Sequence, residues 1–315
     1  MCVFLLALFT FIISACGIEE TANQREFTIE ETYKIKAGVS ETSSLVVLLP
    51  VSYAYQKVAN IKVDGADTYD MEEVTDNLSI LRVQISGTGQ ERVIRISYDI
   101  TLERGKLEWD YENREKNALP ETLIESDDPQ VIKIADSLVD DQNEYKTAKN
   151  IAHYVSSTIK FDYSEKINIE RQTAVKTLTD KKGICADYAN LMVAMLRATG
   201  ISARSISGIA LADLGKIQDW GHQGGSHAWV EFFVDGKWHF AEPTWGDSYF
   251  DNSDGYHLSY GDTGIESELY NKELNIFLAN ESYTIIGSMS APLKFILAST
   301  DKNGTVLPSA KVNKR

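Results

Sequence analysis

The sequence has no cluster of lysine and arginine, and its 31 Lys and Arg are outnumbered by 46 Asp and Glu, which gives a formal net charge of −15. Phosphate backbones bind through clustered basic side chains, so we expect no nucleic-acid partner. Low-complexity stretches and internal repeats are also missing. The 315 residues include 15 Tyr, 11 Phe and 5 Trp, which excludes a disordered acidic chain. The length predicts about two folded domains.

The apolar run at the start of the chain is too short for a membrane-spanning helix. Residues 1–15 carry no charge, but the run falls short of the ~20 residues that a spanning helix needs, so it indicates the core of a signal peptide. The string from Ile13 to Gly17 resembles the lipobox of bacterial lipoproteins, which implies cleavage before Cys16 and a lipid on Cys16. We therefore expect an exported lipoprotein, anchored on the outer face of a membrane. The alternative is an uncleaved helix with an incidental cysteine.

The sequence contains only three cysteines. If Cys2 leaves with the signal peptide and Cys16 carries a lipid, Cys185 is the single remaining thiol and cannot form an internal disulfide. Such a thiol is either an inert buried hydrophobic group or a reactive one. The residues around Cys185 must decide between the two.

The first half of the mature chain has the pattern of β-strands. After a polar tether over residues 16–26, apolar and β-branched residues alternate with polar ones from Phe27 to about Glu108, with turn signals roughly every ten residues. This pattern predicts an antiparallel β-sandwich over residues 27–115. A C-terminal extension over residues 256–315 contains further possible strands and ends in a basic tail that we expect to be frayed.

The middle of the chain changes to helical spacing. A proline at position 129 follows two aspartates and predicts the start of one helix, and residues 144–160 predict a second. His153 lies on the polar face of that second helix, so we expect a solvated side chain. A short third helix begins near Ala174, and a fourth runs from Cys185 to Gly200. Together with the strands that follow, these elements predict an α+β core over residues 120–255.

Cys185 lies at the start of the fourth predicted helix. Unpaired backbone N–H groups at a helix N-terminus favour a thiolate over a thiol, and the same groups can hold an oxyanion. Position alone leaves the alternative open, because free cysteines are among the most buried residues.

Asp235 and Gly236 predict a tight hairpin between two strands of large residues. A two-residue turn fixes the register, in which Val234 faces Lys237 and the numbers of facing residues sum to 471. His227 and Glu242 then share one face at diagonal positions, within reach of each other. His239 falls on the opposite face, where we expect a surface or packing role. Asp247 lies beyond a proline and fits the orienting role less well.

The segments GICADYANLMVAMLRATGISARSISG and HAWVEFFVDGKWHFAEPTW resemble the transglutaminase-like family, whose core is similar to that of papain-type cysteine proteases. The resemblance covers roughly residues 120–250. It implies that Cys185 is the nucleophile and His227 the general base, and that Glu242 is the third member, where the family usually has Asp. Tyr163 and Trp220 are weaker candidates for the cleft or oxyanion site.

These features predict cysteine-dependent acyl transfer on protein or peptide amides, without a cofactor. Hydrolysis would make the protein a protease or amidase, and transfer to an amine would make it a cross-linking enzyme. The alternative is a binding module that keeps the fold and has lost turnover. A metal site built from Asp219, His222 and His227 is disfavoured because no second ligand cluster has zinc spacing.

Overall fold

The computed structural model describes residues 23–36, 42–75, 78–86, 90–110, 116–162, 172–211, 225–262, 272, 275, 284–288, 295–299 and 305–314. The expected lipid attachment site Cys16 lies outside these residues, as do Tyr163, Trp220, Asp219 and His222. Within the described ranges, no helix is both long enough and apolar enough to cross a membrane.

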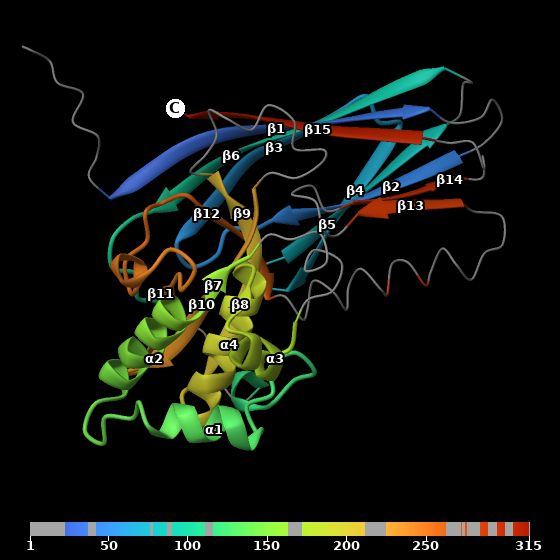
Figure 1. Ribbon diagram of the computed structural model, residues 1–315. Helices are drawn as coiled ribbons and strands as arrows, with labels where there is room; N and C mark the ends of the chain where they lie inside the picture. Colours follow the sequence, from blue (N-terminus) through green and yellow to red (C-terminus); the bar gives the residue numbers. More distant parts are fainter. Residues whose placement is uncertain are drawn as a thin grey trace, which may run out of the picture.

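Two antiparallel sheets form a β-sandwich, as the alternating pattern predicts (Figure 1). One sheet has the strand order β15-β1-β6-β3 and the other β13-β14-β2-β5-β4. Inward-facing residues alternate with exposed ones along β1, where Phe27, Ile29, Tyr33 and Ile35 are fully buried. The strands are β1 (Gln24–Lys36), β2 (Thr42–Pro50), β3 (Gln56–Asp64), β4 (Thr68–Thr75), β5 (Leu78–Ser86), β6 (Glu91–Glu103), β13 (Thr284–Ser288), β14 (Phe295–Ser299) and β15 (Thr305–Lys314).

Strands from the C-terminal part of the chain complete both sheets of the sandwich. β14 pairs with β2, and β15 pairs with β1 along ten residues, from Phe27 opposite Lys314 to Lys36 opposite Thr305. The expectation of a frayed basic tail is therefore wrong, because Lys311 and Asn313 belong to a paired strand. Alternating apolar residues on β15, among them buried Ala310, explain why this charged segment is ordered.

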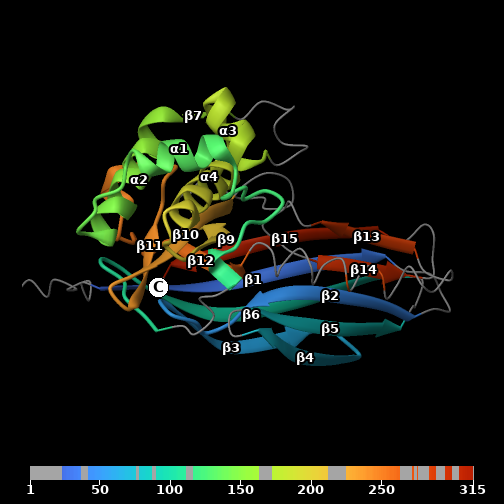
Figure 2. The same ribbon diagram turned by 90° about the horizontal axis from the view of Figure 1, so that it is seen from below.

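The second half of the fold is a four-stranded antiparallel sheet of order β11-β10-β9-β12, with the helices packed on one face (Figure 2). Its strands are β9 (Ala203–Ala210), β10 (Ser226–Val234), β11 (Lys237–Ala241) and β12 (His257–Asp262). The helices are α1 (Pro129–Asp136), α2 (Glu144–Thr158), α3 (Ala174–Asp180) and α4 (Cys185–Ala198). Two short 3-10 helices, η1 (Lys116–Ala118) and η3 (Asp247–Tyr249), and the paired two-residue strands β7 (Lys160–Phe161) and β8 (Lys182–Gly183) complete this half. The predicted α+β fold class is confirmed.

Local sequence signals explain where the helices begin. The Asp128 side chain accepts a hydrogen bond from the backbone N–H of Gln130 (2.8 Å), and that of Asn143 caps α2 through Lys146 N–H (2.8 Å). α4 is different, since it is rich in apolar residues and 12 of its 14 residues are buried. Such a helix lies inside a domain rather than on its surface.

The two faces of β10 contact different parts of the molecule. Ala228, Val230 and Phe232 pack against the helices, whereas Trp229 packs with Tyr55 from the loop between β2 and β3. Behind Trp229, the buried Glu231 carboxylate accepts hydrogen bonds from Arg204 Nε (2.8 Å) and from the hydroxyl groups of two sandwich tyrosines. The sheet is thereby held between the helices and the sandwich, which fixes the position of its edges.

Candidate active site

Cys185 is the first residue of α4, and a buried carboxylate fixes the turn that presents it. Asp187, with no exposed surface, accepts hydrogen bonds from the backbone N–H groups of Ile184 (2.9 Å) and Gln172 (2.9 Å). The same carboxylate lies against Gly183, where an added Cβ would come within 2.6 Å of Asp187 Cβ. The glycine thus leaves room for the cap, and the cap satisfies a backbone donor at the helix start.

The helix start also leaves two backbone donors beside the thiol. The first N–H groups of a helix have no partner within it. Those of Asp187 and Tyr188 donate to the Ile184 carbonyl (2.9 and 3.1 Å). The N–H groups of Cys185 and Ala186 have no backbone acceptor among the described residues, so they can donate to a substrate oxygen. The Cys185 side chain is half-buried and is a free thiol.

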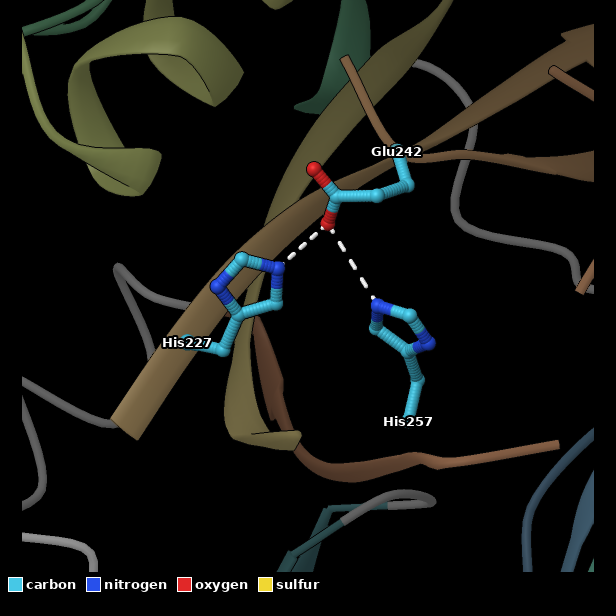
Figure 3. A group of neighbouring side chains, drawn as sticks. All are labelled: His227, Glu242 and His257. Atoms are coloured by element: carbon cyan, nitrogen blue, oxygen red, sulfur yellow. Dashed lines mark hydrogen bonds and ion pairs between the residues drawn. The ribbon is translucent and has the colours of Figure 1, made fainter. Parts of the chain in front are cut away.

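His227 and Glu242 meet as the hairpin register predicts. The ladder pairs Val234 with Lys237 and Val230 with Ala241, which confirms the predicted register. Glu242 follows the last residue of β11, and its Oε2 lies 2.5 Å from His227 Nε2 (Figure 3). Its other oxygen, Oε1, accepts the backbone N–H of Thr244 (2.7 Å), so the turn after the strand also holds the carboxylate.

The His227 ring contacts the thiol as well as the carboxylate. Burial disfavours the charged ring, but the negative charge of Glu242 and hydrogen bonds with Cys185 and Glu242 outweigh it and raise the pKa of His227 from 6.5 to about 10. Burial likewise opposes ionisation of Glu242, but the charge and hydrogen bond of His227 hold the pKa of this carboxyl below its usual value. Because Nε2 contacts Glu242, Nδ1 is the ring nitrogen that is left to accept a proton from sulfur. The three residues therefore form a connected thiol, imidazole and carboxylate set.

An aromatic cover shields the pair from water. Trp245 stacks on the His227 ring, with centroids 5.0 Å apart and planes 19° apart, and Tyr249 packs edge-on against Trp245 (5.3 Å). His227 itself is 8% exposed and Glu242 1%. In such surroundings a hydrogen-bonded ion pair is electrostatically stronger than in water.

The other candidates from the sequence lie elsewhere. His153 is exposed on α2, as predicted, and its Nδ1 lies 2.7 Å from Asp247, so Asp247 is not a partner of His227. His239 is buried and stacks on Phe232 (5.3 Å), with Nδ1 3.1 Å from Asp251. Its role is packing, which was one of the two roles expected for it.

Two residues near the site were missed in the sequence. Asp187 had a local signal, because a carboxylate in the first turn of a helix is a common cap. His257 had none, because it lies on β12, and β12 joins the sheet through β9 rather than through a neighbouring hairpin. Its Nε2 lies 3.4 Å from Glu242 Oε2 (Figure 3).

His227, Glu242 and His257 also form a group that could ligate a metal, since one ligand atom from each lies within 4.8 Å of the others. Two ligands of a tetrahedral zinc ion lie about 3.3 Å apart, given metal–ligand distances of about 2.0–2.1 Å. The 2.5 Å between His227 Nε2 and Glu242 Oε2 is a hydrogen-bond distance instead. The geometry therefore fits a hydrogen-bonded pair better than a metal centre.

Comparison with known proteins relates the core of the chain to a known family. Residues 132–243 match the model of the transglutaminase-like superfamily. The mouse kyphoscoliosis peptidase is 24% identical over 129 residues, which cover 38% of this chain and 18% of that protein. An uncharacterised Mycobacterium leprae protein, ML0607, is 29% identical over 85 residues, or 27% of this chain and 30% of its own. This chain therefore matches less than a third of either relative.

A solved structure resembles this chain over most of its length. The crystal structure of a protein from Cytophaga hutchinsonii, described as a candidate cysteine protease, has a TM-score of 0.57 to this chain at 14% identity. The likeness covers 93% of this chain and 91% of that one, so it includes the sandwich as well as the core.

Proposed function

Because residues 132–243 are a transglutaminase-like domain, we propose that the protein transfers acyl groups from protein or peptide amides through a thioester on Cys185. The observation that carries this proposal is the His227 ring, which is close enough to Cys185 to affect its proton affinity and lies 2.5 Å from the Glu242 carboxylate. A neutral thiol attacks a carbonyl poorly, and this arrangement supplies both a proton acceptor and its orienting carboxylate.

The first half-reaction forms the thioester. The Cys185 sulfur attacks the amide carbon, and the carbonyl oxygen gains negative charge that the N–H groups of Cys185 and Ala186 stabilise. The carbon–nitrogen bond then breaks, and protonated His227 gives its proton to the departing amine. Glu242 stays ionised and keeps the ring in position.

The second half-reaction releases the acyl group. Water or a second amine attacks the thioester carbon and gives its proton to His227, and the carbon–sulfur bond breaks to restore the thiolate. Water as acceptor gives hydrolysis, and a lysine-type amine gives cross-linking. Both outcomes use the same three residues.

Glu242 supports this activity although the family resemblance suggests Asp. The extra methylene is accommodated because Glu242 lies one residue past the end of β11. The backbone N–H of Thr244 holds its second carboxylate oxygen, Oε1. A binding module without turnover would not need a buried carboxylate against a buried imidazole, which costs free energy unless the pair is well hydrogen-bonded.

The test is alkylation of Cys185 by iodoacetamide at about pH 6, where an ordinary thiol with a pKa of about 8.5 is protonated. The proposal predicts rapid labelling, slow labelling in His227→Ala, and none at this position in Cys185→Ser. Mass spectrometry after incubation with a mixed peptide pool should then detect a Cys185 adduct. Equally slow labelling in the wild-type and His227→Ala proteins would favour the binding module.

We further propose that the enzyme acts outside the cytoplasm, held at a membrane by a lipid on Cys16, with protein or peptide substrates. The lipobox-like string before Cys16 supports this proposal. Metabolic labelling with a radioactive fatty acid should mark the wild-type protein and not Cys16→Ala. A labelled Cys16→Ala protein, or an unlabelled wild type, would contradict it.

A further inference from the structure

His257 lies against the proposed active site although it falls outside the residues that match the family model. It is the first residue of β12 and is 1% exposed. Its ring packs edge-on against Trp229 (5.0 Å) and Phe240 (5.1 Å) and at a tilt against Trp245 (4.7 Å). Trp245 also stacks on His227, so both imidazoles share one aromatic wall.

Each nitrogen of the His257 ring faces a carboxylate. Nδ1 lies 3.1 Å from Asp254 Oδ1, and Nε2 lies 3.4 Å from Glu242 Oε2 (Figure 3). The second distance is long for a hydrogen bond, and Nε2 makes no bond of ordinary geometry within the described part of the chain. A buried polar nitrogen without another partner needs an explanation, and Glu242 is the polar group beside it.

Both carboxylates are ionised in their surroundings. Burial opposes ionisation of Asp254, but the hydrogen bond and charge of His257 outweigh it and lower the pKa of Asp254. An ionised carboxylate only accepts hydrogen bonds, and a neutral imidazole has only one N–H. Only the imidazolium form of His257 can donate to Asp254 and Glu242 together.

The neighbouring chain holds His257 in this position. Asp254 Oδ1 also accepts the backbone N–H of Tyr256 (2.9 Å), and Arg25 Nε donates to the Asp254 carbonyl (2.9 Å). The charged groups around the ring are therefore Asp254, Glu242 and His227, with Arg25 behind Asp254. Together with Cys185 beside His227, these side chains form a connected series of ionisable groups.

We propose that His257 is a positioning residue, whose charged ring donates to Glu242 and keeps this longer carboxylate aligned with His227. A glutamate has one more rotatable bond than an aspartate and needs more contacts to be fixed. With Thr244 N–H on one oxygen and two imidazoles on the other, the Glu242 carboxylate has a single arrangement. The role of His257 in turnover rests on the proposed function, whereas its ionic state does not.

Two substitutions separate the hydrogen bond from the volume of the ring. His257→Phe keeps a planar ring without a donor, and it should lower kcat by up to about a hundredfold with KM unchanged, because small misplacements of catalytic groups have effects of that size. His257→Gln restores an N–H donor near Nε2, so it should recover most of the lost rate. His239→Phe is the matched control, since His239 is also buried, lies 3.1 Å from an aspartate, and does not contact Glu242.

Nuclear magnetic resonance of ¹⁵N-histidine tests the same proposal without a substrate, and the chain has only five histidines. The His257 ring should give the pattern of an imidazolium, and the His227 signals should move in His257→Phe but not in His239→Phe. A neutral His257, or unchanged His227 signals together with wild-type kcat in His257→Phe, would overturn the proposal. Slow labelling of Cys185 in a protein with the predicted spectra would instead reject the proposed function alone.

Discussion

Glu31 in the sandwich and Glu242 in the core are both 1% exposed, yet their surroundings move their acidities in opposite directions. Glu31 accepts hydrogen bonds from Tyr98 (2.6 Å) and Tyr33 (2.7 Å), which only partly oppose the effect of burial, so its pKa rises from 4.5 to about 7. At Glu242 the charge of His227 outweighs burial and lowers the pKa. Neutral donors satisfy a buried carboxyl, whereas a cation keeps it ionised. The ionised carboxylate, Glu242, belongs to the proposed catalytic set.

The largest effect should come from removing the charge of Glu242. Glu242→Gln retains the volume but leaves His227 without its anionic partner, so turnover should fall by about 10⁴-fold, as expected when the orienting carboxylate of a triad becomes an amide. Steady-state hydrolysis of a peptide amide measures the change. Turnover within threefold of wild type would remove Glu242 from the mechanism.

In the sandwich, the matching substitution Glu31→Gln should change stability and leave turnover unchanged. Since the pKa of Glu31 is higher in the folded protein than its ordinary value, the folded state binds the proton more tightly, and the free energy of unfolding falls as pH rises from about 4.5 to about 7. Over this range, protonation of Glu31 changes the free energy of unfolding by about 3 kcal/mol in total. Glu31→Gln should lose this dependence and be the more stable protein above pH 7.

Urea unfolding across this pH range measures the effect, with turnover of Glu31→Gln expected to be unchanged. The control is Glu30→Gln, which alters the exposed neighbour on the same strand. Parallel stability curves for the wild-type and Glu31→Gln proteins would contradict the assignment.

Shortening the catalytic carboxylate should have a smaller effect than neutralising it. An aspartate on the same backbone is one methylene shorter. It cannot keep both the 2.5 Å contact with His227 Nε2 and the 3.4 Å contact with His257 Nε2. Glu242→Asp should therefore reduce kcat by about ten- to a hundredfold. A large gain in kcat would mean that Glu242 is a degraded version of the aspartate that the family resemblance implies.

The smallest effect should follow from crowding the cap of α4. Gly183→Ala places a methyl group 2.6 Å from Asp187 Cβ, so the capping carboxylate must shift. Such overpacking costs about 1–3 kcal/mol. Thermal unfolding and the rate of Cys185 alkylation should both decline, whereas Gly236→Ala, with open space around the glycine but a positive φ of 81°, should affect stability alone.

Local patterns predicted the pairing of His227 with Glu242, whereas contacts between distant segments could not be predicted. The Asp235-Gly236 turn fixed the register that brings Glu242 to His227, and Asp128 and Pro129 marked the start of α1, because these features depend on a few adjacent residues. Neither the insertion of β15 beside β1 nor the placement of His257 against Glu242 has a local signal. Both depend on contacts between segments far apart in the sequence.

The most direct test of the account is the ultraviolet absorbance of the Cys185 thiolate, measured as the difference between the wild-type protein and Cys185→Ser. Paired with the protonated ring of His227, the thiolate should already absorb at about pH 6, well below the ordinary thiol pKa of about 8.5. In His227→Ala this absorbance should appear only at higher pH. A wild-type protein whose thiolate absorbs no earlier than that of His227→Ala would contradict the central claim.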